Sequence, residues 1–287
     1  MKKFLVFLWV LVMITGLAAA EGIGFTAGLE AVIYDINKPN EKEDAEPYIQ
    51  ANIIYENAFI DEALDLYVEL AYAIGLTKDE YDDKNPQELY FDIMAGYNIG
   101  LGDSSILTVI LENENFMLLS QDEDNAAGIL RPGVRFNQSL DAGDIYIQAD
   151  VPFAYMYFGL DSFMGLDITA GWESEFGLGL SVTGHMLFSD VWGDDSNGFT
   201  GLSLAASYET GPFYMELLAT IPVKEEVAYT YFDSTMMSLI EGISITPLFK
   251  FTVMPGLKIY ASCRFDQINV EGVDMGISPG IGITFSF

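Results

Sequence analysis

The stretch Met275-Gly-Ile-Ser-Pro-Gly-Ile-Gly-Ile-Thr-Phe-Ser-Phe287 at the end of the chain decides the fold. Apolar residues take every second position in it, and small or polar residues take the positions between them. Successive side chains of a β-strand point to opposite faces, so this period predicts a strand with one apolar face and one polar or crowded face.

The first twenty residues have the three parts of a secretory signal peptide. Lys2 and Lys3 are basic, Phe4 to Gly16 is apolar, and Ala18-Ala19-Ala20 matches an A-x-A cleavage site. A transmembrane anchor is the alternative, but the stretch is short for a span and has no positive flank after it. We therefore expect residues 1–20 to be removed on export and residues 21–287 to form one domain.

The composition combines high acidity with high hydrophobicity. Loss of Lys2 and Lys3 leaves ten Lys and Arg against 43 Asp and Glu, a formal charge of −33, although 51% of all residues are hydrophobic. Nucleic acid is excluded as a partner, because phosphate binding needs clustered Lys and Arg. Cys263 is the only cysteine, so no internal disulfide is possible.

Alternation like that of the last segment recurs along the whole chain after residue 20. It predicts fourteen strands, at 24–34, 47–57, 63–77, 88–99, 105–116, 128–140, 144–158, 165–174, 177–188, 198–209, 212–223, 242–253, 257–266 and 275–287. Twelve strands is the alternative count. The connections alternate between short turns such as 101–104 and 254–256 and longer polar loops such as 35–46 and 224–241. This rhythm is typical of an antiparallel up-and-down β-barrel of an outer membrane, with the short turns in the periplasm.

The charged residues fall on one face of each run. In 88–99, Leu89, Phe91 and Ile93 share the apolar face and Asp92 lies on the other. A Lys or Arg on the lipid face near the bilayer midplane costs about 2–4 kcal/mol, so the absence of charge from every apolar face favours a membrane barrel. A soluble β-sandwich, whose strands also alternate, is the competing fold.

The mature chain resembles the outer-membrane β-barrel class over essentially its whole length, on the Ala18-Ala19-Ala20 site and the closing Ile281-Gly-Ile-Thr-Phe-Ser-Phe287. In size and strand number it resembles the monomeric fourteen-stranded porins. The resemblance implies that Phe285 and Phe287 belong to the signal read by the barrel-assembly machinery. It also implies contact with outer-membrane lipid and lipopolysaccharide, and it favours a monomer. Barrels with an N-terminal plug need residues before the first strand, and this chain leaves no room for them.

Two motifs with possible chemistry do not fit an enzyme. Gly276-Ile-Ser-Pro-Gly280 matches G-x-S-x-G, but a nucleophile elbow needs a strand-to-helix turn and this match lies inside a strand. His185 is the only histidine and is expected to be a structural residue of the lumen face. The acidic loop segments 79–83 and 121–125 lack the glycine-spaced pattern of an EF-hand. We expect no catalytic residue, no cofactor and no dedicated metal site.

The polar face of the predicted barrel is rich in charge, with acids outnumbering bases. Two of its pairs, Arg131 with Glu112 and Arg135 with Asp150, are expected to face one another, and Lys250 is expected nearly opposite Lys258 with an acid such as Glu216 nearby. Fourteen strands enclose more room than side chains fill, so this face predicts a water-filled interior. The predicted pore-lining residues are Glu30, Glu69, Asp92, Glu112, Arg131, Arg135, Asp150, Glu216, Lys250, Lys258 and Arg264.

Two functions are consistent with this pattern. One is a channel for passive diffusion of small hydrophilic solutes, with a preference for cations. The other is a non-conducting display or adhesion barrel that acts through its acidic loops. Loop 224–241 bears on both, because its apolar middle either folds into the lumen, caps the outer mouth or binds a partner.

Overall fold

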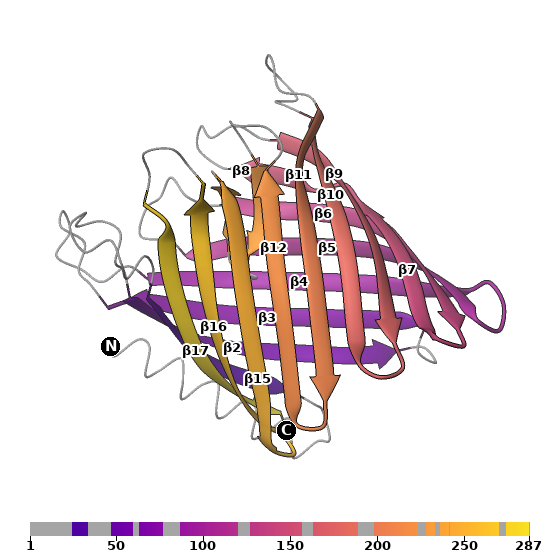
Figure 1. Ribbon diagram of the computed structural model, residues 1–287, viewed down its shortest axis with the longest axis horizontal. Coiled ribbons are helices and arrows are strands. Elements are labelled where there is room, and N and C mark those ends of the chain that lie inside the picture. Colours follow the sequence, from indigo (N-terminus) through magenta and orange to yellow (C-terminus); the bar gives the residue numbers. More distant parts are fainter. Residues whose placement is uncertain are drawn as a thin grey trace.

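The protein forms a closed, all-antiparallel β-barrel in a computed structural model (Figure 1). The structure describes residues 25–33, 47–59, 63–76, 87–119, 127–156, 163–188, 198–222, 228–232, 236–240, 242–269 and 274–286. Neighbouring strands pair all the way round, and β10 pairs with both β9 and β11, so the sheet has no free edge.

The strand boundaries follow the alternating runs of the sequence. The strands of the barrel are β1 (Thr26–Ile33), β2 (Pro47–Phe59), β3 (Leu64–Gly75), β4 (Gln87–Gly100), β5 (Ser105–Leu119), β6 (Ala127–Leu140), β7 (Gly143–Asp150), β8 (Phe153–Met156), β9 (Phe163–Ser174), β10 (Leu178–Phe188), β11 (Gly198–Thr210), β12 (Phe213–Pro222), β15 (Ile243–Met254), β16 (Leu257–Ile268) and β17 (Gly276–Ser286).

β7 and β8 are two parts of one strand. Both pair with β6 and with β9, and they are separated only by Val151 and Pro152. The ladder continues through the break, because the amide of Val151 donates to the carbonyl of Pro132 and the amide of Gly165 donates to the carbonyl of Pro152. Counted this way, the fifteen-stranded sheet is a barrel of fourteen strands, which confirms the larger of the two predicted strand numbers.

Each strand has an apolar outer face and a polar inner face. The outer face carries large exposed apolar side chains, with Ile147 57% and Ile281 65% accessible. The register keeps these residues aligned from strand to strand, as in the outward pairs Phe136↔Ile147 and Val109↔Val134. Within the described strands, every Asp, Glu, Lys and Arg occupies an inward position of this register.

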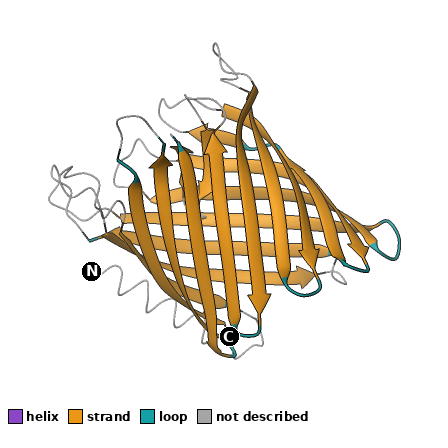
Figure 2. Ribbon diagram, in the orientation of Figure 1, coloured by secondary structure: helices purple, strands orange, loops and turns teal. Residues whose placement is uncertain are grey.

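Short turns gather at one end of the barrel (Figure 2). The turn between β9 and β10 shows why glycine is needed there: Gly177 has φ of +89°, and a Cβ on it would lie 2.2 Å from the carbonyl oxygen of Glu209. The strands run far enough beyond these turns to hold several layers of inward side chains.

Loop 224–241 contains a secondary element that the sequence period did not predict. β13 (Ala228–Phe232) and β14 (Met236–Ile240) pair as a separate two-stranded hairpin, and β13 lies close to β11 and β12.

Some predictions fall outside the described residues. These are the signal peptide at 1–20, Phe287, and the acidic segments 79–83 and 121–125. Phe285 is described, on the outer face of β17 opposite Ala27 and Leu257. No helix in the described ranges is long and apolar enough to cross a bilayer.

Candidate functional site: the inner wall

Acids dominate the inner wall along β2, β3 and β4. Glu69 and Asp92 lie directly opposite one another on β3 and β4, and both are buried. Glu69 accepts hydrogen bonds from the amide of Asn52, at 2.6 Å, and from the hydroxyl of Tyr67. Two opposed carboxylates repel unless donors or cations surround them, so Asn52 and Tyr67 are the groups that stabilise this pair.

A second acidic position lies on β1. Glu30 is half-buried, opposite Gln50 on β2 and Gly282 on β17. The carboxylate of Glu30 lies next to Gly280 of β17: a Cβ added to Gly280 would be 3.2 Å from Glu30 Oε1. The acidic wall therefore extends from β1 to β4.

β6 brings bases against this wall. Arg131 lies directly opposite Glu112 on β5, which confirms the predicted pair. The predicted pairing of Arg135 with Asp150 is wrong by one inward position, because Asp150 lies opposite Gly133 and Arg135 lies opposite Gln148. Asp150 therefore sits between the two arginines and interacts electrostatically with both.

Arg135 has other partners. Its guanidinium lies over the ring of Tyr146 at 4.1 Å from the centroid, and its Nε donates to the side-chain oxygen of Asn137 at 2.8 Å. Stacking holds the guanidinium plane against the wall while its charge stays on the inner face.

The other bases lie on β15 and β16, across the barrel from β6. In the strand order, with β7 and β8 counted as one, β16 is the seventh strand from β6 in either direction. Figure 1 shows β6 on the far wall and β16 on the near wall. Arg264 pairs with Asp266 two residues along β16, with Nε 2.5 Å from Oδ2. The two basic groups thus face one another, rather than one basic wall facing one acidic wall.

Lys250 and Lys258 lie one inward position apart across β15 and β16, close to the predicted near-opposite arrangement but not directly opposite. The two-residue turn at 255–256 places Lys250 opposite Tyr260, and Lys258 opposite Thr252. Lys250 Nζ also lies 5.1 Å from the ring centroid of Tyr214, whose hydroxyl donates to Glu216. Tyr214 therefore contacts both groups, Lys250 through its ring and Glu216 through its hydroxyl.

A chain of hydrogen bonds, here called the polar belt, runs round the inner wall from β9 to β12. His185 Nδ1 lies 2.9 Å from Oδ1 of Asp167, and His185 Nε2 lies 2.8 Å from Oγ of Ser203. Ser203 Oγ is in turn 3.0 Å from Oγ1 of Thr220. Asp167 and His185 are only 2% and 3% exposed, and Asp150 lies directly opposite Asp167 on β7.

Sequence reasoning did not identify the partners of His185. Asp167 and Ser203 lie eighteen residues on either side of it, which is about one strand and one connection away. This spacing could have indicated the partners. Residues on neighbouring strands that are separated by one strand and one connection lie at a similar height in the barrel wall. Ser278 of the G-x-S-x-G match lies inside β17 opposite Arg264, which agrees with its interpretation as an ordinary strand residue.

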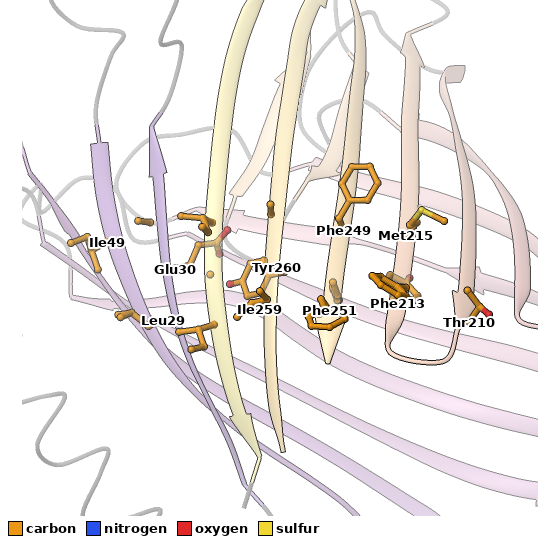
Figure 3. A pocket seen from close by; sticks show the side chains of 17 residues that line it. Leu29, Glu30, Ile49, Thr210, Phe213, Met215, Phe249, Phe251, Ile259 and Tyr260 are labelled. Carbon is orange, nitrogen blue, oxygen red and sulfur yellow. The ribbon is translucent and has the colours of Figure 1, made fainter. Parts of the chain in front are cut away.

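A hollow lies on the outer face of the barrel, lined almost entirely by apolar surface. Its volume is about 890 Å³. The residues that line it come mainly from β12, β15, β16 and β17 and from the first two strands, β1 and β2. Figure 3 shows Phe213, Met215 and Phe249 on neighbouring strands at this hollow. Small residues such as Ala31 and Ala261 between large ones account for its depth. Among the described residues, no group of three or more His, Cys, Asp or Glu is placed to hold a metal ion.

Comparison with known proteins gives a likeness of fold at very low identity. No family model matches the chain, and no curated protein matches it. Among solved structures, a mutant of the Rhodopseudomonas blastica porin is similar with 10% identity and a TM-score of 0.47, over 92% of this chain and 99% of that one. The Acinetobacter baumannii outer membrane protein Omp33 is similar with 8% identity and a TM-score of 0.49, over 92% of this chain and 98% of that one.

Proposed function

We propose that the protein is an outer-membrane barrel that lets small hydrophilic solutes diffuse through a charged, water-filled interior, with a preference for cations. The observation that carries the proposal is the complete separation of the two faces. The described strands turn only uncharged residues outward and present their charged residues to the interior. The apolar outer side chains can contact lipid. The closed strand ladder also leaves no unpaired backbone N–H or C=O group exposed to the bilayer.

The inner wall supports the solute path. Ionised side chains are stable only where water or polar partners surround them. Several charged residues of the inner wall lie at exposed positions near the short turns, among them Asp144, Glu173 and Lys250. Acids on β1 to β5 precede the first inward base, Arg131, so a cation meets a continuous acidic wall on that side. The proposed pore-lining residues are those predicted from the sequence, with the pairing of Arg135 corrected as above.

One observation favours the alternative, a non-conducting display barrel. Inward side chains in the half farther from the short turns, including Glu69, Asp150, His185, Thr220 and Ser244, are almost completely buried. A barrel closed at that level would act through its outer loops instead.

Single-channel recording separates the two functions. The mature protein, folded in detergent and added to a planar bilayer, should produce discrete, ohmic conductance steps whose size rises with salt concentration. A barrel that inserts, as shown by protease protection of its strands, but carries no current would refute the channel and support display.

A further inference from the structure

We propose that Ser203 is an activated nucleophile that reacts with small soluble acyl esters, with His185 as its base and Asp167 as the group that orients His185. The inference rests on the polar belt and does not depend on the channel function. His185 Nδ1 contacts the carboxylate of Asp167 at 2.9 Å and His185 Nε2 contacts the hydroxyl of Ser203 at 2.8 Å. Nucleophile, base and orienting acid within hydrogen-bond reach, in that order, define a serine triad by geometry whatever the fold.

The direction of the hydrogen bonds follows from the chemistry of the groups. An ionised carboxylate can only accept, so Nδ1 carries the proton and donates to Asp167. Nε2 is then the acceptor, and the hydroxyl of Ser203 donates to it. Thr220 lies 3.0 Å from Ser203 Oγ and can donate into the oxygen lone pair, which leaves the serine proton directed at His185.

Asp167 belongs to a larger charged cluster on the inner wall. Asp150 lies opposite Asp167 on the next strand, and the two acids interact electrostatically. Arg131 and Arg135 also interact electrostatically with Asp150. The same acids disfavour an anionic substrate, so the expected substrate is a neutral or cationic ester.

A β-bulge lies at the site. The register of β10 and β11 shifts between His185 and Met186, so that these residues pair with Gly201 and Phe199 and Thr200 is left without a Cα partner on β10. Bulges re-aim side chains and release backbone groups from the ladder, and they are enriched next to active sites. Gly201, directly beside His185, adds no side chain on the inner face. A substrate that approaches Ser203 from the long loops therefore meets less steric hindrance than it would with a larger residue at position 201.

The proposed reaction is acyl transfer to serine and then to water. Ser203 Oγ bonds to the ester carbonyl carbon as its proton passes to His185 Nε2. His185 returns that proton to the departing alkoxide, the ester C–O bond breaks, and the acyl group stays on Ser203. Water then attacks the acyl carbon as its proton passes to His185 Nε2. The bond between that carbon and Ser203 Oγ breaks, Nε2 returns the proton to Oγ, and the carboxylic acid is released. Because the site faces the interior, the substrate arrives from water rather than from the surrounding lipid.

The test uses a fluorophosphonate probe on the folded full-length mature protein. Ser203 Oγ should displace fluoride from phosphorus, and peptide mass spectrometry should place the adduct on Ser203 of the unmodified sequence. Ser203→Ala should abolish the adduct. His185→Gln and Asp167→Asn should each lower the labelling rate by about 10²-fold or more, the scale of general-base catalysis.

Ser181→Ala is the matched control, because Ser181 lies on the inner face of β10 four residues before His185 and opposite Ala205. It should leave the rate unchanged. Labelling of Ser203 no faster than of Ser181, or a His185→Gln rate equal to that of the unmodified protein, would overturn the proposal and make the polar belt purely structural. The mapping on the unmodified protein decides the question even if a variant fails to fold. Conductance does not enter this readout, so the failure of either proposal can be told from failure of the other.

Discussion

The carboxylate of Asp150 fills the space above Gly133: its Oδ1 lies 2.0 Å from where a Cβ on residue 133 would be. The two residues are register partners on β7 and β6, and Asp150 is 2% exposed. Glycine at 133 therefore gives the acid its place between Arg131 and Arg135.

Gly133→Ala should destabilise the folded barrel by about 1–3 kcal/mol, the usual cost of overpacking, because the buried Asp150 has little room to move. Urea unfolding in detergent measures this as a lower midpoint. Gly100→Ala is the control, since a Cβ there would meet nothing within 4 Å. Equal midpoints for the two variants would mean that Asp150 moves freely.

Turn glycines should differ according to what surrounds them. Gly177→Ala forces a side chain into positive φ and against the carbonyl oxygen of Glu209, whereas Gly211, at φ +56°, has open space around it. Gly211→Ala should cost about 1–2 kcal/mol for the left-handed backbone alone, and Gly177→Ala should cost more. Urea unfolding midpoints of the two variants measure this, and Gly177→Ala should have the lower midpoint. A lower midpoint for Gly211→Ala would contradict the turn geometry.

The assignment of faces can be tested with single cysteines in a Cys263→Ala background. Outward positions should react only with a lipid-soluble thiol reagent, and inward ones only with a water-soluble reagent. Mixed reactivity within one strand would contradict the register. The matched neighbours are Ile93 and Asp92, Val134 and Arg135, Leu180 and Ser181, and Ile283 and Thr284.

Deleting Phe287 should lower the amount of assembled barrel in the outer membrane without lowering export. The alternation of β17 continues to this residue in the sequence, and the terminal strand must be recognised before β17 can close on β1. Quantitative immunoblots of periplasmic and membrane fractions, compared with a Phe285→Leu variant, measure the effect. Normal assembly of the deletion would make Phe287 an ordinary interfacial aromatic.

The strands and their faces could be predicted from the sequence because both depend on a local period of two. The pairs across the wall depend on register, which turns and bulges set. Arg131 and Glu112 were predicted correctly. Arg135 and Asp150 were predicted to face one another but lie one inward position apart, because register and not alternation fixes the exact partner.

The polar belt was beyond the same reasoning for a related reason. Asp167, His185 and Ser203 come from three strands, so their contacts depend on the registers of two strand pairs. The alternation assigns each residue to a face but does not fix which residues of neighbouring strands lie opposite one another. The histidine was therefore assigned to the correct face without its partners.

The central claim, that ions pass along an acid-rich inner wall, is tested most directly by the reversal potential in a planar bilayer under a potassium chloride gradient. The account predicts a cation-selective potential that weakens as salt shortens the Debye length from about 10 Å at 0.1 M to about 3 Å at 1 M. Replacing Glu69, Asp92 and Glu112 by their amides should weaken it further, because these acids face the interior on three consecutive strands. The same replacement at Asp144, Glu173 and Glu209, three exposed acids near the short turns, removes equal charge and should have a smaller effect. An anion-selective reversal potential would contradict the account, since it would mean that Arg131, Arg135 and Arg264 control the narrowest part of the path.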